Sequence, residues 1–102
     1  MTIKAEDLNH CKLITFTESL DANHTRALRE LFDNILVDVN KKVVLDFSNT
    51  NKIDASGIGA IIYLFKRLHR QGHELELIGL KAQPLELVKS LHLDYTMKLV
   101  SM

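Results

Sequence analysis

The feature that most constrains the fold of this chain is an apolar run at residues 43–47, which leads through a polar loop into an amphipathic stretch at residues 58–68. The run opens with Val43, Val44 and Leu45, and consecutive apolar residues of this kind are typical of a strand buried on both faces. In the later stretch, apolar residues recur at helical spacing. The sequence therefore predicts a buried strand, a polar connection and a helix that packs against a sheet.

The end of this connection carries the residue types most suited to a functional site. Its order is Ile53, Asp54, Ala55, Ser56, Gly57, Ile58, Gly59. Asp54 and Ser56 can each cap the helix, because either side-chain oxygen can accept from the free backbone N–H groups of the first turn. Glycines inside a helix cost on the order of 0.8–1 kcal/mol each relative to alanine. We interpret Gly57 and Gly59 as a way of leaving the hydroxyl of Ser56 open to another molecule.

Composition limits the classes of function. A chain of 102 residues with 46% hydrophobic content predicts one domain, spanning residues 1–102. Thirteen basic residues balance thirteen acidic ones, and a net charge of +0 argues against nucleic acid or an anionic membrane as a partner. With Cys11 as the single cysteine and no run of about 18 apolar residues, we expect a cytoplasmic protein without a disulfide or membrane insertion.

The first half of the chain predicts two strands and a helix. Residues 3–9 and 11–16 contain β-forming residues and are expected to form a hairpin. Asp21 or Asn23 is then expected to cap a helix that runs to about Val37, because apolar residues recur there at helical spacing.

The second half predicts a strand, a helix and a final strand. Residues 74–80 alternate polar and apolar side chains before becoming apolar, which is typical of a strand. Pro84 suits the first turn of a helix that buries Leu87, Val88 and Leu91. Residues 97–100 are a candidate for a short final strand. The whole order predicts an α/β fold with a mixed, mostly parallel sheet of about four to five strands and three helices packed over it.

The helix after Ser56 is apolar over more of its circumference than one sheet contact requires. The side chains expected to face the sheet are Ile58, Ile61, Ile62, Phe65 and Leu68. Ala60, Tyr63 and Leu64 lie off this stripe. Either they form a partner-binding patch beside Ser56 or a neighbouring helix covers part of them.

The central segment resembles the signature of the STAS domain, the family that includes the bacterial anti-sigma factor antagonists. The shared pattern is a strand ending in Leu45-Asp46-Phe47-Ser48, a short loop, and Asp54-Ala55-Ser56-Gly57-Ile58-Gly59 at the start of a helix. A second stretch, Ser19-Leu20-Asp21-Ala22, is similar to a family motif at the first helix. Ser56 occupies the family's phosphorylation position, whereas Ala55 replaces the first serine of the usual pair.

This resemblance implies a non-catalytic switch that needs no cofactor or metal. Ser56 would be phosphorylated by a serine kinase of the histidine-kinase-like ATPase fold and reset by a metal-dependent serine phosphatase, and the unmodified form would bind a downstream effector protein. Similarity to STAS regulators of biofilm formation implies biofilm control as one output. The alternative is a structural STAS subunit of a transporter or other larger assembly that is not phosphorylated. The implied partner-binding residues are Asp21, Asp46, Asp54, Ala55, Gly57, Ile58, Gly59, Ala60, Tyr63 and Leu64.

Two of these aspartates also have a purely structural explanation. Asp46 can bond loop backbone groups at the end of its strand, and Asp21 can cap a helix. The family resemblance places both near the binding face, so both interpretations stay open.

An enzyme is the least favoured class. The chain has five histidines, but it lacks a Gly-x-Ser-x-Gly motif around Ser56, and nothing in the sequence brings a histidine to that serine. His69 and His73 have the i, i+4 spacing of helical metal ligands, but Gly72 is expected to end the helix between them.

Overall fold

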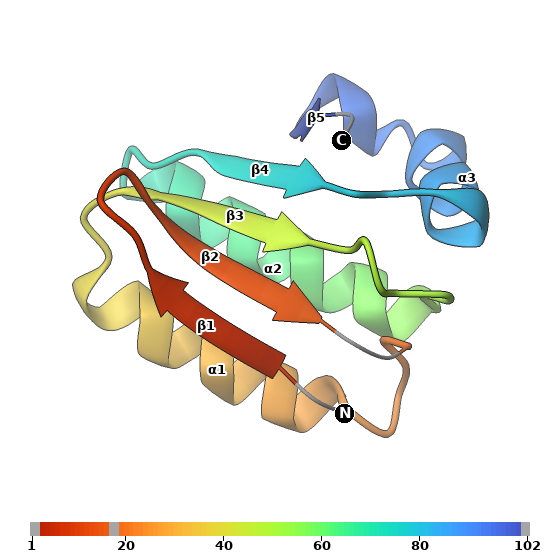
Figure 1. The fold of residues 1–102 in the computed structure, drawn as a ribbon, viewed down its shortest axis with the longest axis horizontal. Helices are drawn as coiled ribbons and strands as arrows, with labels where there is room; N and C mark the ends of the chain where they lie inside the picture. The colour runs from red at the N-terminus through yellow and green to blue at the C-terminus, as the bar shows by residue number, and fades with distance from the viewer. Residues whose placement is uncertain (1–2, 17–18, 101–102) are drawn as a thin grey trace.

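The computed structural model describes residues 3–16 and 19–100 and shows a five-stranded sheet with two long helices on one face (Figure 1). The strands stand in the order β1-β2-β3-β4-β5. Their bounds are β1 Ile3–Asp7, β2 Cys11–Phe16, β3 Lys42–Asp46, β4 Leu75–Ile78 and β5 Lys98–Val100. Strand β1 is antiparallel to β2, and every other neighbouring pair is parallel. The predicted hairpin and the predicted mixed, mostly parallel sheet are confirmed.

The helices are α1 Thr25–Asp38, α2 Ala55–Arg70 and α3 Ala82–Ser90, and a short 3-10 turn, η1 Leu93–Tyr95, follows. In Figure 1, α1 and α2 lie side by side behind the sheet, and α3 lies past the carboxyl end of β4. This placement follows from the connections, because parallel neighbouring strands joined by crossover helices put those helices on a face of the sheet.

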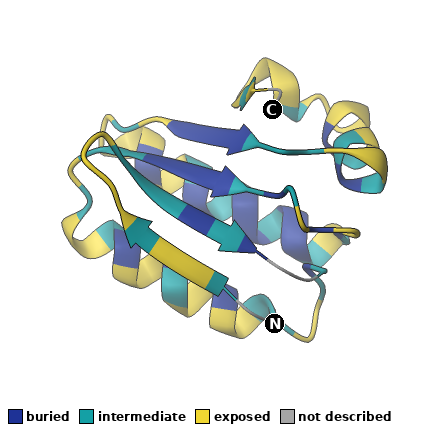
Figure 2. Ribbon diagram, in the orientation of Figure 1, coloured by how far each residue is buried: buried dark blue, intermediate teal, exposed yellow. Residues whose placement is uncertain are grey.

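The core lies between the sheet and the first two helices, where Figure 2 shows buried residues on the central strands and on the inner sides of the helices. Val43, Val44 and Leu45 are all buried, as the apolar run predicts. Phe16 and Phe47 stack with their ring centroids 5.2 Å apart, at the carboxyl ends of β2 and β3. This core fixes the end of β3 from which the chain leads into α2.

The predicted core stripe of α2 contacts the core at every position, but its members differ in how deeply they are buried. Ile62 and Phe65, expected in the core, are half-buried, whereas Ala60 and Leu64 are 0% exposed. Because α1 packs along α2, this helix has a second contact face besides the one on the sheet. Ala60 and Leu64 are therefore buried within the domain, whereas Tyr63 of the same apolar set is half-buried.

The predicted caps of α1 are also wrong. The helix begins at Thr25, with His24 at the N-cap position and no side-chain cap hydrogen bond. The carboxylate of Asp21 instead accepts from the backbone N–H of Asn23 at 3.0 Å and lies 2.8 Å from Nδ1 of His24. Asp21 therefore organises the turn before the helix.

The last helix agrees with the prediction at its start and differs at its end. Pro84 lies in the first turn of α3, and Val88 is fully buried. Leu91, expected on the buried side, is 48% exposed because α3 ends at Ser90.

Candidate functional site

The candidate site is the connection from β3 to the start of α2, where the chain passes beside the segment that precedes α1 (Figure 1). The backbone N–H of Leu20 donates to the carbonyl of Lys52 at 2.9 Å, and the N–H of Asp54 donates to the carbonyl of Leu20 at 3.0 Å. These bonds make Leu20 and Ile53 a parallel bridge outside the main strands. The turn that carries Ser56 is thus attached to the segment that precedes α1.

Asp54, rather than Ser56, caps α2. Its backbone is extended, and its Oδ1 accepts from the N–H of Gly57 at 3.0 Å. Its Oδ2 accepts from the N–H of Ala22 at 3.2 Å. Ser56 is the second residue of the helix and is half-buried, and within residues 3–16 and 19–100 its hydroxyl makes no hydrogen bond. The cap of α2 therefore does not depend on this hydroxyl.

The two glycines of the motif have different roles. A Cβ at Gly57 would lie 2.7 Å from the carbonyl oxygen of Leu20 and 2.9 Å from its Cβ, so only glycine permits this close approach. A Cβ at Gly59 would meet nothing within 4 Å. The close approach of Leu20 therefore explains Gly57, whereas Gly59 leaves open space one helical turn beyond Ser56, and its role in exposing the serine stays a prediction.

Farther along the same side of α2, Tyr63 is held by groups from both helices. Its hydroxyl bonds to the carboxylate of Asp33 on α1, and Arg67 Nη2 donates to the same hydroxyl at 3.4 Å. The guanidinium carbons of Arg29 and Arg67 lie 4.9 and 5.3 Å from the ring centroid, which is cation–π distance. The hydrogen bond with Tyr63 also raises the pKa of Arg67. These contacts fix the orientation of the half-exposed Tyr63 ring.

The structure separates the expected partner-binding residues into two groups. Ala55 is exposed, and the half-buried members are Asp21, Asp46, Asp54, Gly59 and Tyr63. The other four, Gly57, Ile58, Ala60 and Leu64, are buried. Their side of α2 faces the core and has little exposed surface in this conformation, and the expectation that a partner touches them stays a prediction.

Asp46 has the structural role that the sequence allowed. Its Oδ1 accepts from the backbone N–H of Ser48 at 2.9 Å, which fixes the first turn of the loop after β3. Gly79, with φ of +74°, packs so closely on this turn that a Cβ would lie 2.7 Å from the nitrogen of Ser48. Among the described residues, no hydrogen bond runs from Asp46 to Ser56.

Residues 2–101 match the family model of the STAS domain. The chain is a STAS domain. Its fold is similar to three solved structures. A candidate anti-sigma factor antagonist from Thermotoga maritima has a TM-score of 0.90 at 17% identity, covering 98% of this chain and 86% of that one. The anti-sigma factor antagonist SpoIIAA in its unphosphorylated form has a TM-score of 0.79 at 12% sequence identity, and the match covers 99% of this chain and 89% of that one. The Bacillus cell fate determinant SpoIIAA in its phosphorylated form has a TM-score of 0.80 at 13% sequence identity, and the match covers 99% of this chain and 91% of that one.

Sequence reasoning missed one residue of this STAS domain that contacts the site. The side chain of Gln83, in the first turn of α3, bonds both backbone groups of Ile53: its Nε2 donates to the carbonyl, and its Oε1 accepts from the N–H, each at 2.9 Å. No periodicity or motif signals a contact between a side chain and a backbone 30 residues away.

In the described part of the STAS domain, the histidines make no hydrogen bond to Ser56 and belong to no cluster of metal-ligating side chains. Nδ1 of His24 lies 2.8 Å from a carboxylate oxygen of Asp21 near the candidate site, but no hydrogen bond among the described residues joins a histidine to Ser56. Across residues 3–16 and 19–100, no group of three or more histidine, cysteine, aspartate or glutamate side chains is placed to hold a metal. None of the helices described in these ranges is both long and apolar enough to span a membrane.

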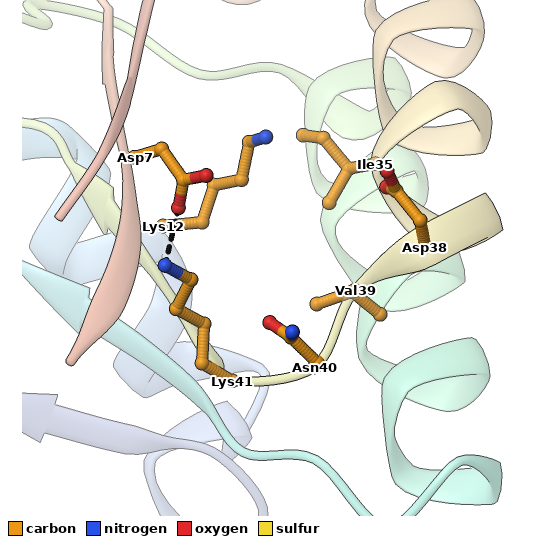
Figure 3. Close-up of a pocket in the computed structure, with 7 residues that line it drawn as sticks. All are labelled: Asp7, Lys12, Ile35, Asp38, Val39, Asn40 and Lys41. Carbon is orange, nitrogen blue, oxygen red and sulfur yellow. Dashed lines mark ion pairs between the residues drawn. The ribbon is translucent and has the colours of Figure 1, made fainter. Parts of the chain in front are cut away.

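A small polar cavity of about 180 Å³ lies at the other end of β3, between the β1–β2 hairpin and the end of α1 (Figure 3). Lys41 Nζ lies 2.5 Å from the carboxylate of Asp7 on its rim, and this hydrogen bond lowers the pKa of Asp7. Since Ser56 follows the carboxyl end of β3 and Lys41 precedes its first residue, the cavity is separate from the candidate site.

Proposed function

We propose that this STAS domain is a phosphorylation-controlled partner-switching regulator with Ser56 as the acceptor. One observation carries the proposal: Asp54 supplies the cap of α2, so the hydroxyl of the half-buried Ser56 is not needed for the cap and is left for other chemistry. A kinase can modify this hydroxyl without removing a bond that holds the turn. Ala55 and Gly59 beside it present little side-chain bulk to an incoming protein.

The switch acts through charge. Phosphorylation adds roughly −1.5 to −2 charges and three acceptor oxygens, and the positive end of the α2 dipole stabilises such a group. A partner that covers Ser56 would instead have to bury the phosphate beside the carboxylate of Asp54. An unfavourable change of only about 1.4 kcal/mol lowers affinity tenfold. The unmodified form therefore binds, and the phosphorylated form is released.

The proposed partners are three classes of protein in the cytoplasm. A serine kinase of the histidine-kinase-like ATPase fold modifies Ser56, a metal-dependent serine phosphatase resets it, and a downstream effector binds the unmodified form, with biofilm formation as one proposed output. The family assignment and the existence of SpoIIAA in an unphosphorylated and a phosphorylated form support this scheme. We propose no catalytic activity for the domain itself.

A second candidate function is a structural subunit that is not phosphorylated, such as a module docked on a transporter. It is favoured by one observation, the half-exposed Ile62 and Phe65 on α2, which a permanent partner would cover.

Quantitative affinity purification from the native cell separates the two functions. The baits are the wild-type domain, Ser56→Ala, Ser56→Asp and the matched control Ser90→Asp, which adds the same charge at the exposed end of α3. The switch predicts partners that are retained by wild type, Ser56→Ala and Ser90→Asp and depleted about tenfold or more by Ser56→Asp. Equal retention by all four baits would contradict the switch and favour the structural subunit.

A further inference from the structure

The side-chain amide of Gln83 completes the hydrogen bonding of Ile53, the residue that leads into the Ser56 turn. Donor and acceptor of one amide face the carbonyl and the N–H of one backbone residue, both at 2.9 Å. Ile53 is fully buried and Gln83 is half-buried, so both bonds are partly shielded from solvent. Paired bonds of this kind fix orientation as well as distance.

The amide takes the place of a missing strand. On its other side, the segment is bonded to Leu20 through the carbonyl of Lys52 and the N–H of Asp54. In an extended chain, the backbone groups of successive residues point to opposite sides, so those of Ile53 point away from Leu20. A buried backbone N–H or carbonyl without a partner is unfavourable. Gln83 is the group that satisfies both.

The start of α3 adopts an uncommon backbone conformation directly before this contact. Ala82 has φ of +50°, in the left-handed region that alanine rarely occupies. Backbone strain of this kind persists only where surrounding contacts hold it, and it concentrates at functional sites. Here the strained residue immediately precedes Gln83, and Gly79 in the same connection packs on Ser48 of the β3 loop.

We propose that Gln83 is a positioning residue that ties the Ser56 turn to α3. Its amide holds Ile53 and, through the next residue, the Asp54 cap, so the presentation of Ser56 depends on the position of α3. The consequence for phosphorylation rests on the proposed function; the tie itself does not.

Amide hydrogen exchange measured by NMR on the unmodified full chain tests the tie without a kinase. Gln83→Met keeps the side-chain length but removes the donor and the acceptor. The matched control is Gln71→Met, because Gln71 is exposed and its amide makes a single bond of 3.3 Å to the carbonyl of Leu36. We expect exchange at Ile53 to accelerate at least about tenfold in Gln83→Met, with Leu45 in β3 unchanged and Gln71→Met like wild type.

Two results would overturn the proposal. One is wild-type exchange at Ile53 in Gln83→Met. The other, which also covers a variant that fails to fold, is the absence in the wild-type protein of an NMR scalar coupling through the hydrogen bond from the Gln83 side-chain nitrogen to the Ile53 carbonyl carbon.

A kinase assay in native-cell extract then tests the consequence. The initial rate of Ser56 phosphorylation should fall at least about threefold in Gln83→Met and stay unchanged in Gln71→Met. If wild-type Ser56 takes no phosphate, the proposed function fails, and the exchange result still decides the tie.

Discussion

The carboxylate of Asp54 accepts a hydrogen bond from the backbone N–H of Ala22 at 3.2 Å, across 32 residues of sequence. Its other oxygen caps α2 through Gly57. One side chain therefore joins the start of α2 to the segment before α1, and the cap of α2 does not require Ser56. This division of roles between Asp54 and Ser56 underlies the predictions for the site.

Removing the cap should cost more stability than removing the proposed phosphate acceptor. We expect Asp54→Ala to lower the free energy of unfolding by about 0.5–2 kcal/mol, because α2 loses its cap. Ser56→Ala should stay within about 0.5 kcal/mol of wild type. Urea unfolding of the two variants measures this difference. A Ser56→Ala variant as unstable as Asp54→Ala would show that the serine is a structural cap after all.

Replacing each of the two motif glycines with alanine should change the free energy of unfolding in opposite directions. At Gly57 the added Cβ would collide with Leu20, so we expect a loss of roughly 1–3 kcal/mol in the free energy of unfolding. At Gly59 the added Cβ meets open space, and alanine should be neutral or stabilising by up to about 1 kcal/mol. Thermal unfolding of the pair checks this. A destabilised Gly59→Ala variant would mean that this face of α2 is not open.

A negative charge should be tolerated at Ser56 and less so at Ser90. Ser56 lies in the first turn of α2, where an acidic group gains about 0.3–1 kcal/mol from the helix dipole, and Ser90 ends α3, where the sign reverses. We therefore expect Ser56→Asp to be more stable than Ser90→Asp, each measured against its alanine variant by urea unfolding at low salt. The opposite order would show that repulsion from Asp54 outweighs the dipole.

Acid should weaken the contact between the hairpin and the entry to β3. Lys41 lowers the pKa of Asp7 below its unfolded value, so this ion pair stabilises the fold above about pH 4 and loses its effect as pH falls through the folded pKa. Asp7→Asn should therefore reduce the dependence of unfolding free energy on pH in this acid range. The same pH profile in Asp7→Asn and wild type would mean that the pair contributes nothing.

The order of elements could be predicted because each depends on a local pattern. The run at Val43–Leu45 indicated a buried strand, and Pro84 marked the first turn of α3. The buried face of α2 could not be predicted fully from its own period. Leu64 is buried and Phe65 is half-buried. Helix α2 contacts α1 as well as the sheet, and the contact with α1 depends on where another element lies.

The position of the site in the chain could be predicted from the sequence, but the contacts between its residues could not. The motif identified Ser56, yet the choice of Asp54 as the cap depends on the extended backbone at that residue. The different roles of Gly57 and Gly59 depend on the approach of Leu20. Gln83 gave no signal at all, because its bonds to Ile53 arise only when the β4–α3 connection folds over the β3 loop.

The most direct test of the central claim is peptide mass spectrometry of the protein purified from its native cell, with and without its candidate serine kinase. We predict a phosphate on Ser56 that is present when the kinase is present and absent when the kinase gene is deleted. An unmodified Ser56 under every condition, in a protein held in a stable complex, would contradict the switch.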